Sequence, residues 1–196
     1  MIKMRHIDIA ISIFAIMITS PLLLLVYMLL RISGNDPIYK HKRVGVNGVQ
    51  FQCIKFRSMV DIESLSKEER NRVESDIKNY GKVYNDPRIT RLGKLIRKTS
   101  IDELPQFFNV LAGDMSIIGP RPITESELSI YGKKASSYLS VKPGLTGLWQ
   151  VSGRSNTSYS RRVAIDHYFA KHNSIKLKFF IFIKTFYVVL LMKGSQ

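Results

Sequence analysis

The longest apolar stretch of the chain lies close to its N-terminus. No formally charged side chain occurs from Ile9 to Leu30, and one helix over this stretch would be roughly 33 Å long, close to the hydrocarbon thickness of a bilayer. A cleaved signal peptide has a shorter apolar run and ends in a small-residue cleavage pattern, which the segment around Arg31 lacks. The pattern therefore predicts a helical membrane segment.

Ser20-Pro21 interrupts this segment in its middle. Proline removes a backbone donor and bends a helix. Basic residues flank the segment on both sides, so the positive-inside rule does not choose an orientation. They are Lys3, Arg5, Arg31, Lys40, Lys42 and Arg43. The residues alone leave two interpretations: a helix-break-helix hairpin that enters one leaflet and returns, and a kinked helix that crosses the bilayer.

The pattern changes after the membrane segment. Alternating apolar and polar positions over residues 38–59 predict two strands, and Asn47-Gly48 predicts the turn between them. Residues 61–85 are polar, and Ser66 and Glu69 have the capping-box spacing of a solvent-exposed helix that ends near Tyr80. We therefore expect a β-hairpin followed by a surface helix.

Helical spacing dominates the second half of the chain. It predicts a helix over residues 89–98, a second from Ser100 to about Gly113 and a third over 158–172. Segments 119–122 and 142–147 contain Gly and Pro and are expected to be rigid, irregular turns. Residues 177–192 are apolar apart from Lys184. They predict either a helix in the membrane interface or a buried core helix.

Length and charge narrow the class of protein. A chain of 196 residues suffices for one domain with a core, and its single cysteine, Cys53, rules out an intrachain disulfide. Lys and Arg outnumber Asp and Glu by 30 to 15, a formal charge of +15. This excess favours nucleic acid, anionic lipid or phosphorylated substrates as partners. Because no helix-turn-helix or RNP-type motif accompanies the charge, nucleic acid is not predicted as a partner.

The densest group of chemically active residues centres on two neighbouring acids, Asp102 and Glu103. Arg88, Arg97 and Arg121 bracket them along the chain. Guanidinium groups bind phosphate oxygens in bidentate fashion. One acid can attack phosphorus while the other holds a divalent cation, and Mg²⁺ is the natural ion because it favours oxygen ligands and phosphates.

The same acids also have a purely structural interpretation. Ser100 and Glu103 have capping-box spacing, and carboxylates in the first turn of a helix are stabilised by its dipole by about 0.3–1 kcal/mol. Taken alone, this motif leaves the structural and the catalytic interpretation open.

Six segments, in order along the chain, resemble the bacterial sugar transferases. These are the monotopic polyprenyl-phosphate phosphoglycosyl transferases that start glycan and capsule assembly. The segments are Lys55-Phe56-Arg57-Ser58-Met59, Asp86-Pro87-Arg88-Ile89-Thr90, Thr99-Ser100-Ile101-Asp102-Glu103-Leu104-Pro105-Gln106, Asn109-Val110-Leu111-Ala112-Gly113-Asp114-Met115-Ser116, Gly119-Pro120-Arg121-Pro122 and Lys142-Pro143-Gly144-Leu145-Thr146-Gly147. The resemblance runs from the apolar N-terminus to about residue 187, and it favours catalysis over helix capping for the acid pair.

The resemblance implies an α+β fold. It predicts a mainly helical monotopic membrane protein with an N-terminal re-entrant helix hairpin, a small β-hairpin and interfacial amphipathic helices. Relatives break the re-entrant helix at a Ser-Pro, which matches Ser20-Pro21. The expected divisions are the hairpin at 1–32, a cytoplasmic catalytic domain at 33–176 and a membrane-interface helix at 177–196. The bacterial inner (cytoplasmic) membrane is the expected location, with the catalytic domain on its cytoplasmic face.

The resemblance also implies a two-step reaction. The aspartate at the position of Asp102 attacks the β-phosphate of a UDP-sugar and releases UMP, and undecaprenyl phosphate then takes the phosphosugar from the enzyme. Asp102 is accordingly the expected nucleophile, and Asp102 and Glu103 are the expected Mg²⁺ ligands. The expected phosphate- and substrate-binding residues are Lys55, Arg88, Arg121, Arg154 and Asp166.

The chain departs from the family pattern near its end. Tyr168 follows Asp166 by two positions, where relatives have an Asp-x-x-Tyr-like spacing, and Lys176-Leu177-Lys178 stands where many relatives have an acid. The additional N-terminal spanning helices of larger relatives are absent, so the catalytic unit alone is expected. The sequence does not choose between UDP-hexose and UDP-N-acetylhexosamine donors, or between a monomer and a homodimer.

Overall fold

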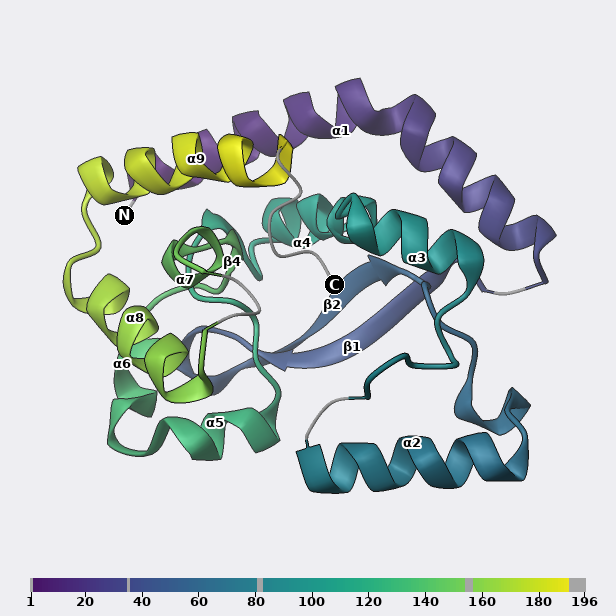
Figure 1. Cartoon of the computed structure of the whole chain (residues 1–196). Helices are drawn as coiled ribbons and strands as arrows, with labels where there is room; N and C mark the ends of the chain where they lie inside the picture. The colour runs from purple at the N-terminus through teal and green to yellow at the C-terminus, as the bar shows by residue number, and fades with distance from the viewer. Residues whose placement is uncertain (1, 35, 81–82, 154–156, 191–196) are drawn as a thin grey trace.

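The computed structural model describes residues 2–34, 36–80, 83–153 and 157–190. Helix α1, Ile2–Ile32, runs along one edge of the molecule and bends as it arches over the remaining elements (Figure 1). Over Met4–Ile32 it is long and apolar enough to cross a membrane, by length and composition. Only 11% of its most apolar window is buried in the protein, so α1 does not have the surroundings of a core helix.

The predicted break at Ser20-Pro21 is wrong, because α1 stays helical through Pro21. Proline cannot donate to the carbonyl four residues earlier, which belongs to Met17. The Ser20 hydroxyl donates to that carbonyl at 2.8 Å and replaces the missing bond. A bent, continuous helix therefore takes the place of two helices joined by a break.

Polar side chains fix the N-terminal end of α1 to the rest of the protein. The Arg5 guanidinium donates to the carbonyls of Val110 and Leu111. Asp8 is buried and accepts hydrogen bonds from the Ser116 hydroxyl at 2.8 Å and from the backbone N–H of Ile117. The other end of α1 packs through Val26 and Leu30 in a small apolar cluster. Both ends of the bent helix thus contact the same body of protein.

The predicted β-hairpin is confirmed. Strands β1 (Ile38–Val44) and β2 (Gln50–Phe56) are antiparallel, and the 3-10 turn Val46–Gly48 joins them. Asn47 has a φ of 55°, a left-handed conformation that asparagine tolerates. Asn109 then pairs with the edge of β2: its amide donates to the Gln52 carbonyl at 2.7 Å, and its side-chain oxygen accepts from the N–H of Ile54 at 2.9 Å.

The two helices predicted after the hairpin are confirmed. Helix α2, Lys67–Tyr80, follows the 3-10 turn Ile62–Ser64 and begins with the expected reciprocal bonds between Ser66 and Glu69. Helix α3, Arg91–Lys98, begins where the Thr90 side chain accepts a hydrogen bond from the N–H of Gly93.

The helix predicted from Ser100 begins later. Ser100 is left-handed, with a φ of 59°, and its side chain makes no capping bond. The 3-10 turn Ile101–Glu103 follows, and helix α4 covers Gln106–Ala112. Pro105 explains the delay, because it has no N–H to continue an α-helical turn. Gly113, with a φ of 95°, ends α4 as predicted.

The segment 142–147, predicted as a turn, contributes a strand instead. Strand β4, Gly144–Thr146, lies parallel to β3, Ser116–Ile118. Glycine allows the two segments to approach closely: a Cβ at Gly144 would lie 2.0 Å from the backbone nitrogen of Gly119. The contact fixes the segment that carries Arg121.

The C-terminal half is helical. Its elements are α5 (Glu125–Tyr131), the 3-10 turn Gly132–Lys134, α6 (Ala135–Leu139), α7 (Leu148–Val151), α8 (Tyr159–Lys171) and α9 (Ile175–Leu190). The predicted helix over 158–172 is confirmed by α8. The main core includes Val110, Met115, Phe169 and Ile181, so it joins α4, the strand β3 region, α8 and α9. The described chain is mostly helical with two small two-stranded sheets.

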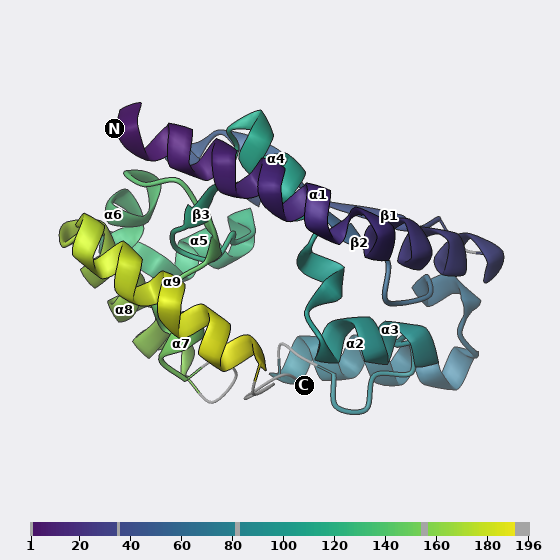
Figure 2. The same cartoon turned by 90° about the horizontal axis from the view of Figure 1, so that it is seen from above.

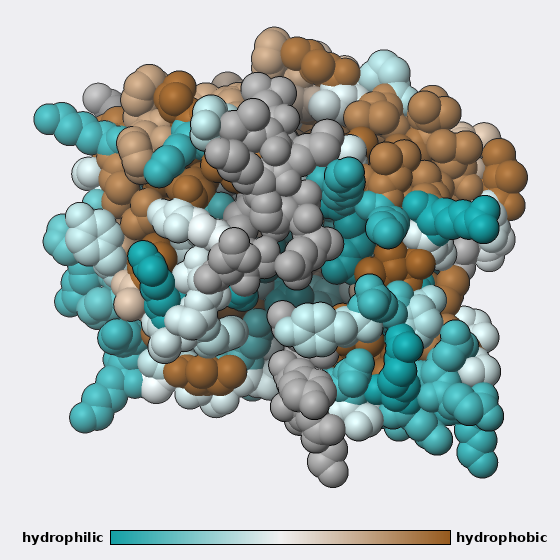
Figure 3. Space-filling model, in the orientation of Figure 1, coloured by the Kyte–Doolittle hydropathy of each residue, from teal (hydrophilic) through white to brown (hydrophobic). Residues whose placement is uncertain are grey.

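Helices α1 and α9 share one edge of the molecule and run apart from each other when seen from above (Figures 1 and 2). Both expose large apolar side chains, including Met17 and Leu25 on α1 and Phe179 and Tyr187 on α9. The space-filling view shows apolar surface over both helices (Figure 3). Helix α9 also buries Ile181 completely, so it combines a core-facing side with an exposed apolar side.

Candidate active site

One large cavity, of about 1390 Å³, lies beneath α1 and α9. Its lining comes from β2, the 3-10 turn 101–103, the segment 119–122 and the facing sides of α1 and α9. The predicted site residues that line it are Lys55, Arg88, Asp102, Glu103 and Arg121. Predicted site residues from four separate parts of the chain are therefore brought to one cavity.

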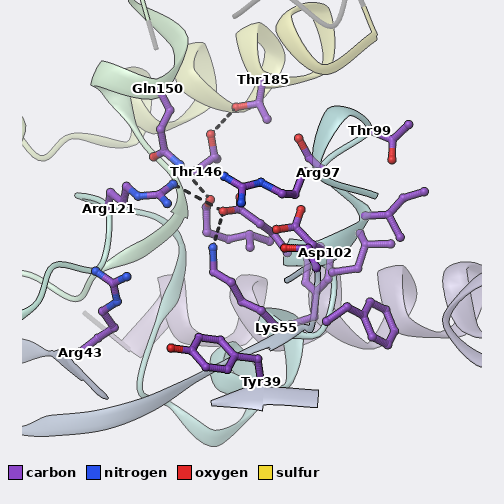
Figure 4. A pocket seen from close by; sticks show the side chains of 18 of the residues that line it. Tyr39, Arg43, Lys55, Arg97, Thr99, Asp102, Arg121, Thr146, Gln150 and Thr185 are labelled. Carbon is purple, nitrogen blue, oxygen red and sulfur yellow. Dashed lines mark hydrogen bonds and ion pairs between the residues drawn. The ribbon is translucent and has the colours of Figure 1, made fainter. Parts of the chain in front are cut away.

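Glu103 is the anion on which two cations converge. The Lys55 ammonium lies 2.7 Å from the Glu103 carboxylate, and the Arg121 guanidinium lies 3.5 Å from the same oxygen (Figure 4). Lys55 is carried by β2, whose position is fixed by Asn109, and Arg121 by the segment that follows β3. The pairing holds the two cations side by side in the cavity, where such groups can bind phosphate oxygens.

Asp102 has a different environment from its neighbour. Within the described ranges no side chain or N–H donates a hydrogen bond to its carboxylate. Burial and, second to it, the negative charge of Glu103 raise the pKa of Asp102 to about 6, although Lys55, Arg97 and Arg121 lower it. A half-buried carboxylate with no donor keeps its lone pairs available for attack on an electrophile.

The turn that carries the two acids is strained at its first residue. Ser100 adopts the left-handed conformation without being glycine or asparagine, which costs on the order of 1 kcal/mol. The Glu103 N–H then donates to the Ser100 carbonyl at 3.2 Å. The Ser100 side chain does not cap a helix here, so the structural interpretation of the acid pair loses its main support.

Arg88 lines the cavity but pairs with another acid. Its guanidinium donates to both carboxylate oxygens of Asp86, at 2.6 Å for the shortest bond. Burial by itself raises the pKa of Asp86, but the hydrogen bonds from Arg88 outweigh it and hold that pKa below its ordinary value. Arg88 is thus a preorganised cation at the side of the cavity, and no contact in the structure joins it to Glu103 or Asp102.

Arg97 is a cavity cation that was part of the sequence cluster but not of the expected binding set. It extends from α3 into the cavity (Figure 4). Among the residues that the structure describes, none makes a hydrogen bond or an ion pair with its guanidinium. The signal in the sequence was its place among the basic residues of a helix, which does not separate a cavity-facing arginine from a solvent-facing one.

Asp166 lies away from the acid pair. It belongs to α8, is 1% exposed and accepts a hydrogen bond from the Tyr131 hydroxyl at 2.8 Å. It does not line the cavity. Burial raises the pKa of Asp166 to about 7, against the hydrogen bond from Tyr131 and the charge of Arg162. Arg154, the remaining expected binding residue, lies outside the described residues.

The acid pair fits Mg²⁺ only in company with a substrate. The described residues contain no group of three or more His, Cys, Asp or Glu side chains that could hold a metal ion. Mg²⁺ is commonly bound by one or two carboxylates together with substrate phosphates and water. The carboxylates of Asp102 and Glu103 match that donor chemistry.

The chain is similar to a known protein family over nearly its whole length. Residues 1–192 match the model of the family described as "Bacterial sugar transferase". The chain is 42% identical over 200 residues to "Exopolysaccharide production protein ExoY" of Sinorhizobium fredii, covering 99% of this chain and 88% of that protein. It is 45% identical over 199 residues to "Undecaprenyl-phosphate galactose phosphotransferase" of Salmonella typhimurium, covering 97% of this chain and 41% of that protein.

A third relative names a donor as well as an acceptor. "UDP-glucose:undecaprenyl-phosphate glucose-1-phosphate transferase" of Klebsiella pneumoniae is 38% identical over 157 residues, 78% of this chain and 31% of that protein. The chain thus spans less than half the length of the Salmonella and Klebsiella relatives. The cavity thus places a pair of acids beside several cations. The chain belongs to the bacterial sugar transferase family.

Proposed function

We propose that this chain transfers a sugar-1-phosphate from a UDP-sugar to undecaprenyl phosphate and releases UMP, as the first membrane step of capsule, exopolysaccharide, O-antigen or glycoprotein glycan assembly. The observation that carries the proposal is the asymmetry of the acid pair. Glu103 is engaged by Lys55 and Arg121, whereas Asp102 has no donor within the described ranges and faces the same cavity. The names of the Salmonella and Klebsiella relatives support the lipid acceptor, and the Klebsiella name supports a UDP-sugar donor.

In the first step of the proposed reaction, a carboxylate oxygen of Asp102 attacks the β-phosphorus of the donor. The bond between that phosphorus and the bridging oxygen breaks, and the oxygen leaves with UMP. The product on the enzyme is an aspartyl phosphosugar. The attack requires the ionised form of Asp102, because only that form offers a nucleophilic lone pair.

In the second step, a phosphate oxygen of the acceptor attacks the phosphorus of the aspartyl phosphosugar. The acyl phosphate bond breaks, Asp102 regains its carboxylate, and a polyprenyl diphosphosugar leaves. Lys55 and Arg121 stabilise the negative charge that gathers on the phosphoryl oxygens in both steps, because both hold their charges at one face of the cavity. Arg97 and Arg88 extend this basic lining toward the rest of the diphosphate.

Mg²⁺ would be held by Asp102 and Glu103 together with substrate phosphates, where it would supply further positive charge for the diphosphate. The chain's own cations are arranged for the same purpose. Glu103 positions Lys55 and Arg121, and its replacement is expected to disperse them.

The proposed setting is the cytoplasmic face of the bacterial inner membrane, with the protein dipping into one leaflet. The two ends of α1 support this placement, because Arg5 and Asp8 at one end and Val26 and Leu30 at the other contact the same protein body. A helix that crossed the bilayer would carry one end away from that body. Helix α9 is proposed to lie in the interface with its exposed phenylalanines toward lipid.

The decisive experiment incubates the purified protein in detergent with UDP-sugars, undecaprenyl phosphate and Mg²⁺, and measures UMP. We expect UMP from at least one UDP-sugar and loss of turnover in Asp102→Asn. Asp76→Asn, on α2 and outside the cavity lining, is the matched control and should turn over like the wild type. A folded protein that releases no UMP from any UDP-sugar contradicts the proposal, and an active Asp102→Asn removes Asp102 as nucleophile.

A further inference from the structure

The cavity that contains the acid pair has a second, apolar part. Ile11, Phe14 and Ile18 line it from α1, and Phe182 and Phe186 line it from α9. The three α1 residues are three and four positions apart, so they form one stripe on one face of that helix. The two phenylalanine rings are one turn apart on α9 and meet edge to face, with centroids 5.0 Å apart. These five residues are called the tail groove below.

The tail groove is not closed by the protein itself. Phe14, Ile18 and Phe186 are 61%, 62% and 55% exposed. Burial of phenylalanine and isoleucine side chains is favourable, so a ligand that covered these side chains would bind more tightly. This gain favours a hydrocarbon over a polar ligand, because the five side chains carry no polar atom and the hydroxyl of Thr185 beside them is already bonded within the protein.

The charges at the other part of the cavity define the ligand's second half. Lys55, Arg97 and Arg121 line the same cavity as the tail groove, and such cations bind phosphate oxygens. A molecule that satisfies both parts carries an anionic phosphate at one end and a hydrocarbon chain at the other. A UDP-sugar has no hydrocarbon chain, so the donor leaves the tail groove unfilled.

We infer that the tail groove binds the first isoprene units of the lipid phosphate acceptor as they enter between α1 and α9. The inference rests on the proposed function and adds the place where the acceptor's chain is held. Continuity argues for this occupant: the groove and Asp102 line one cavity, so a tail in the groove directs its own phosphate toward the aspartyl phosphosugar. Lipid molecules of the bilayer at large are the competing occupant, and they would contact every exposed apolar residue of both helices alike.

The test compares groove residues with equally exposed neighbours outside the cavity. Phe14→Ala and Phe186→Ala each remove one aromatic ring from the lining of the tail groove. Met17→Ala, at 61% exposure on α1, and Phe179→Ala, at 65% exposure on α9, are the controls, because neither residue lines the cavity. All four changes remove apolar surface from the same two helices, so a general loss of membrane contact affects both pairs.

Each protein is assayed with undecaprenyl phosphate and with methyl phosphate, which keeps the phosphate monoester and has no isoprene unit to place in the tail groove. The quantity compared is the ratio of kcat/KM for the long acceptor to kcat/KM for the short one. Both values come from one preparation, so partial unfolding or a weaker donor step cancels in the ratio. We expect the groove variants to lower the ratio by about tenfold each, as the loss of one buried aromatic ring predicts, and the controls to keep it.

Two results overturn the inference: an unchanged ratio in the groove variants, or an equal fall in the control variants, which would assign the groove to the bilayer at large. Failure of the proposed function looks different, because the wild type would then release no UMP with either acceptor. A wild type that releases UMP and prefers the long acceptor, with that preference lost only in Phe14→Ala and Phe186→Ala, establishes the groove.

Discussion

Asp102 and Glu103 are neighbours in the chain with unequal surroundings. Glu103 is held by Lys55 and Arg121, and Asp102 has a raised pKa of about 6 because burial disfavours its charged form. A nucleophile must be ionised, so the protonated fraction of Asp102 limits the first step at low pH. Ionisation is complete above this pKa and is lost as the pH falls through it.

The first prediction concerns this pH dependence. The rate of UMP release in a single turnover, without acceptor, should be constant well above pH 6 and fall by about tenfold per pH unit well below it. Rapid-quench measurements across this range check the profile. Asp76→Asn should reproduce the wild-type curve, while a rate that does not change through pH 6 contradicts the assignment of Asp102.

The second prediction concerns Arg97. Arg97→Ala removes a cavity cation that has no hydrogen-bond or ion-pair partner among the described residues, so the folded state loses no such contact. A hydrogen bond to a charged group contributes about 1.5–3 kcal/mol, and we expect the KM for the UDP-sugar to rise by at least about tenfold with an unchanged Tm. Lys98→Ala, on the same helix and exposed, is the control. Equal KM values for the two variants would show that Arg97 does not contact the donor.

The third prediction concerns Asp166. Its pKa is about 7 in the folded protein against an ordinary 3.8, so the folded state binds its proton more tightly than the unfolded state. Stability should therefore fall as the pH rises from about 4 to 7 and stay level above, at roughly 1.4 kcal/mol for each unit of pKa difference. Asp166→Asn should remove this dependence and raise the Tm at alkaline pH, as thermal unfolding in detergent would show. Loss of activity without this effect on Tm would instead favour the substrate-binding role expected from the sequence.

At the scale of elements, the parallel pairing of β3 with β4 requires glycine where the two backbones approach each other closely. A Cβ at Gly144 would lie 2.0 Å from the nitrogen of Gly119, a backbone atom that cannot move aside cheaply. The fourth prediction is that Gly144→Ala destabilises the protein by about 2–4 kcal/mol, in the range of strong overpacking. Gly48→Ala is the control for the steric clash. Gly48 has a φ of +80° and open space around it, so an added Cβ there meets only the unfavourable backbone conformation. Gly48→Ala should lower the free energy of unfolding by about 1 kcal/mol. An equal loss in Gly48→Ala and Gly144→Ala would contradict the steric explanation.

Elements with local signals could be predicted from the sequence. The hairpin has an asparagine-glycine turn, α2 has its capping box, and α3 and α8 have apolar positions at helical spacing. The pairing of β3 with β4 could not be predicted, because it joins residues 116–118 to 144–146 and leaves no local pattern. Helix α4 begins later than the predicted start at Ser100, because Ser100 is left-handed and Pro105 cannot continue an α-helical turn.

The site was predictable in its chemistry and less so in its geometry. Asp102, Glu103, Lys55 and Arg121 could be chosen from motifs, and the structure brings them together. The distribution of the cations could not be predicted: Arg88 pairs with Asp86 two positions away, while Arg97 faces the cavity. Whether an arginine pairs with a nearby acid or faces the cavity depends on how long-range packing orients the helix or turn that carries it.

At the scale of the whole molecule, the bent α1 touches the remaining protein at both ends. The fifth prediction is that tags at the N-terminus and at the C-terminus are both accessible from the cytoplasm in intact cells, because both chain ends then lie on one side of the membrane. Membrane-impermeant labelling of tags at each end checks this. A cytoplasmic domain probe gives the reference, and labelling of one tag from the periplasmic side contradicts the single-leaflet placement.

The parallel pairing of β3 with β4 also orders the events of synthesis. Lys55 and Glu103 are both made before residue 116, so their ion pair can form while the chain is still emerging. Arg121 is held in place by segments that include the hydrogen bonds from Gly144 to the Pro120 carbonyl and from Gly119 to the Thr146 carbonyl. These hydrogen bonds can form only after Thr146 has been synthesised. The ion pair of Lys55 with Glu103 therefore requires only the first 103 residues, whereas the hydrogen bonds that place Arg121 require the chain through Thr146.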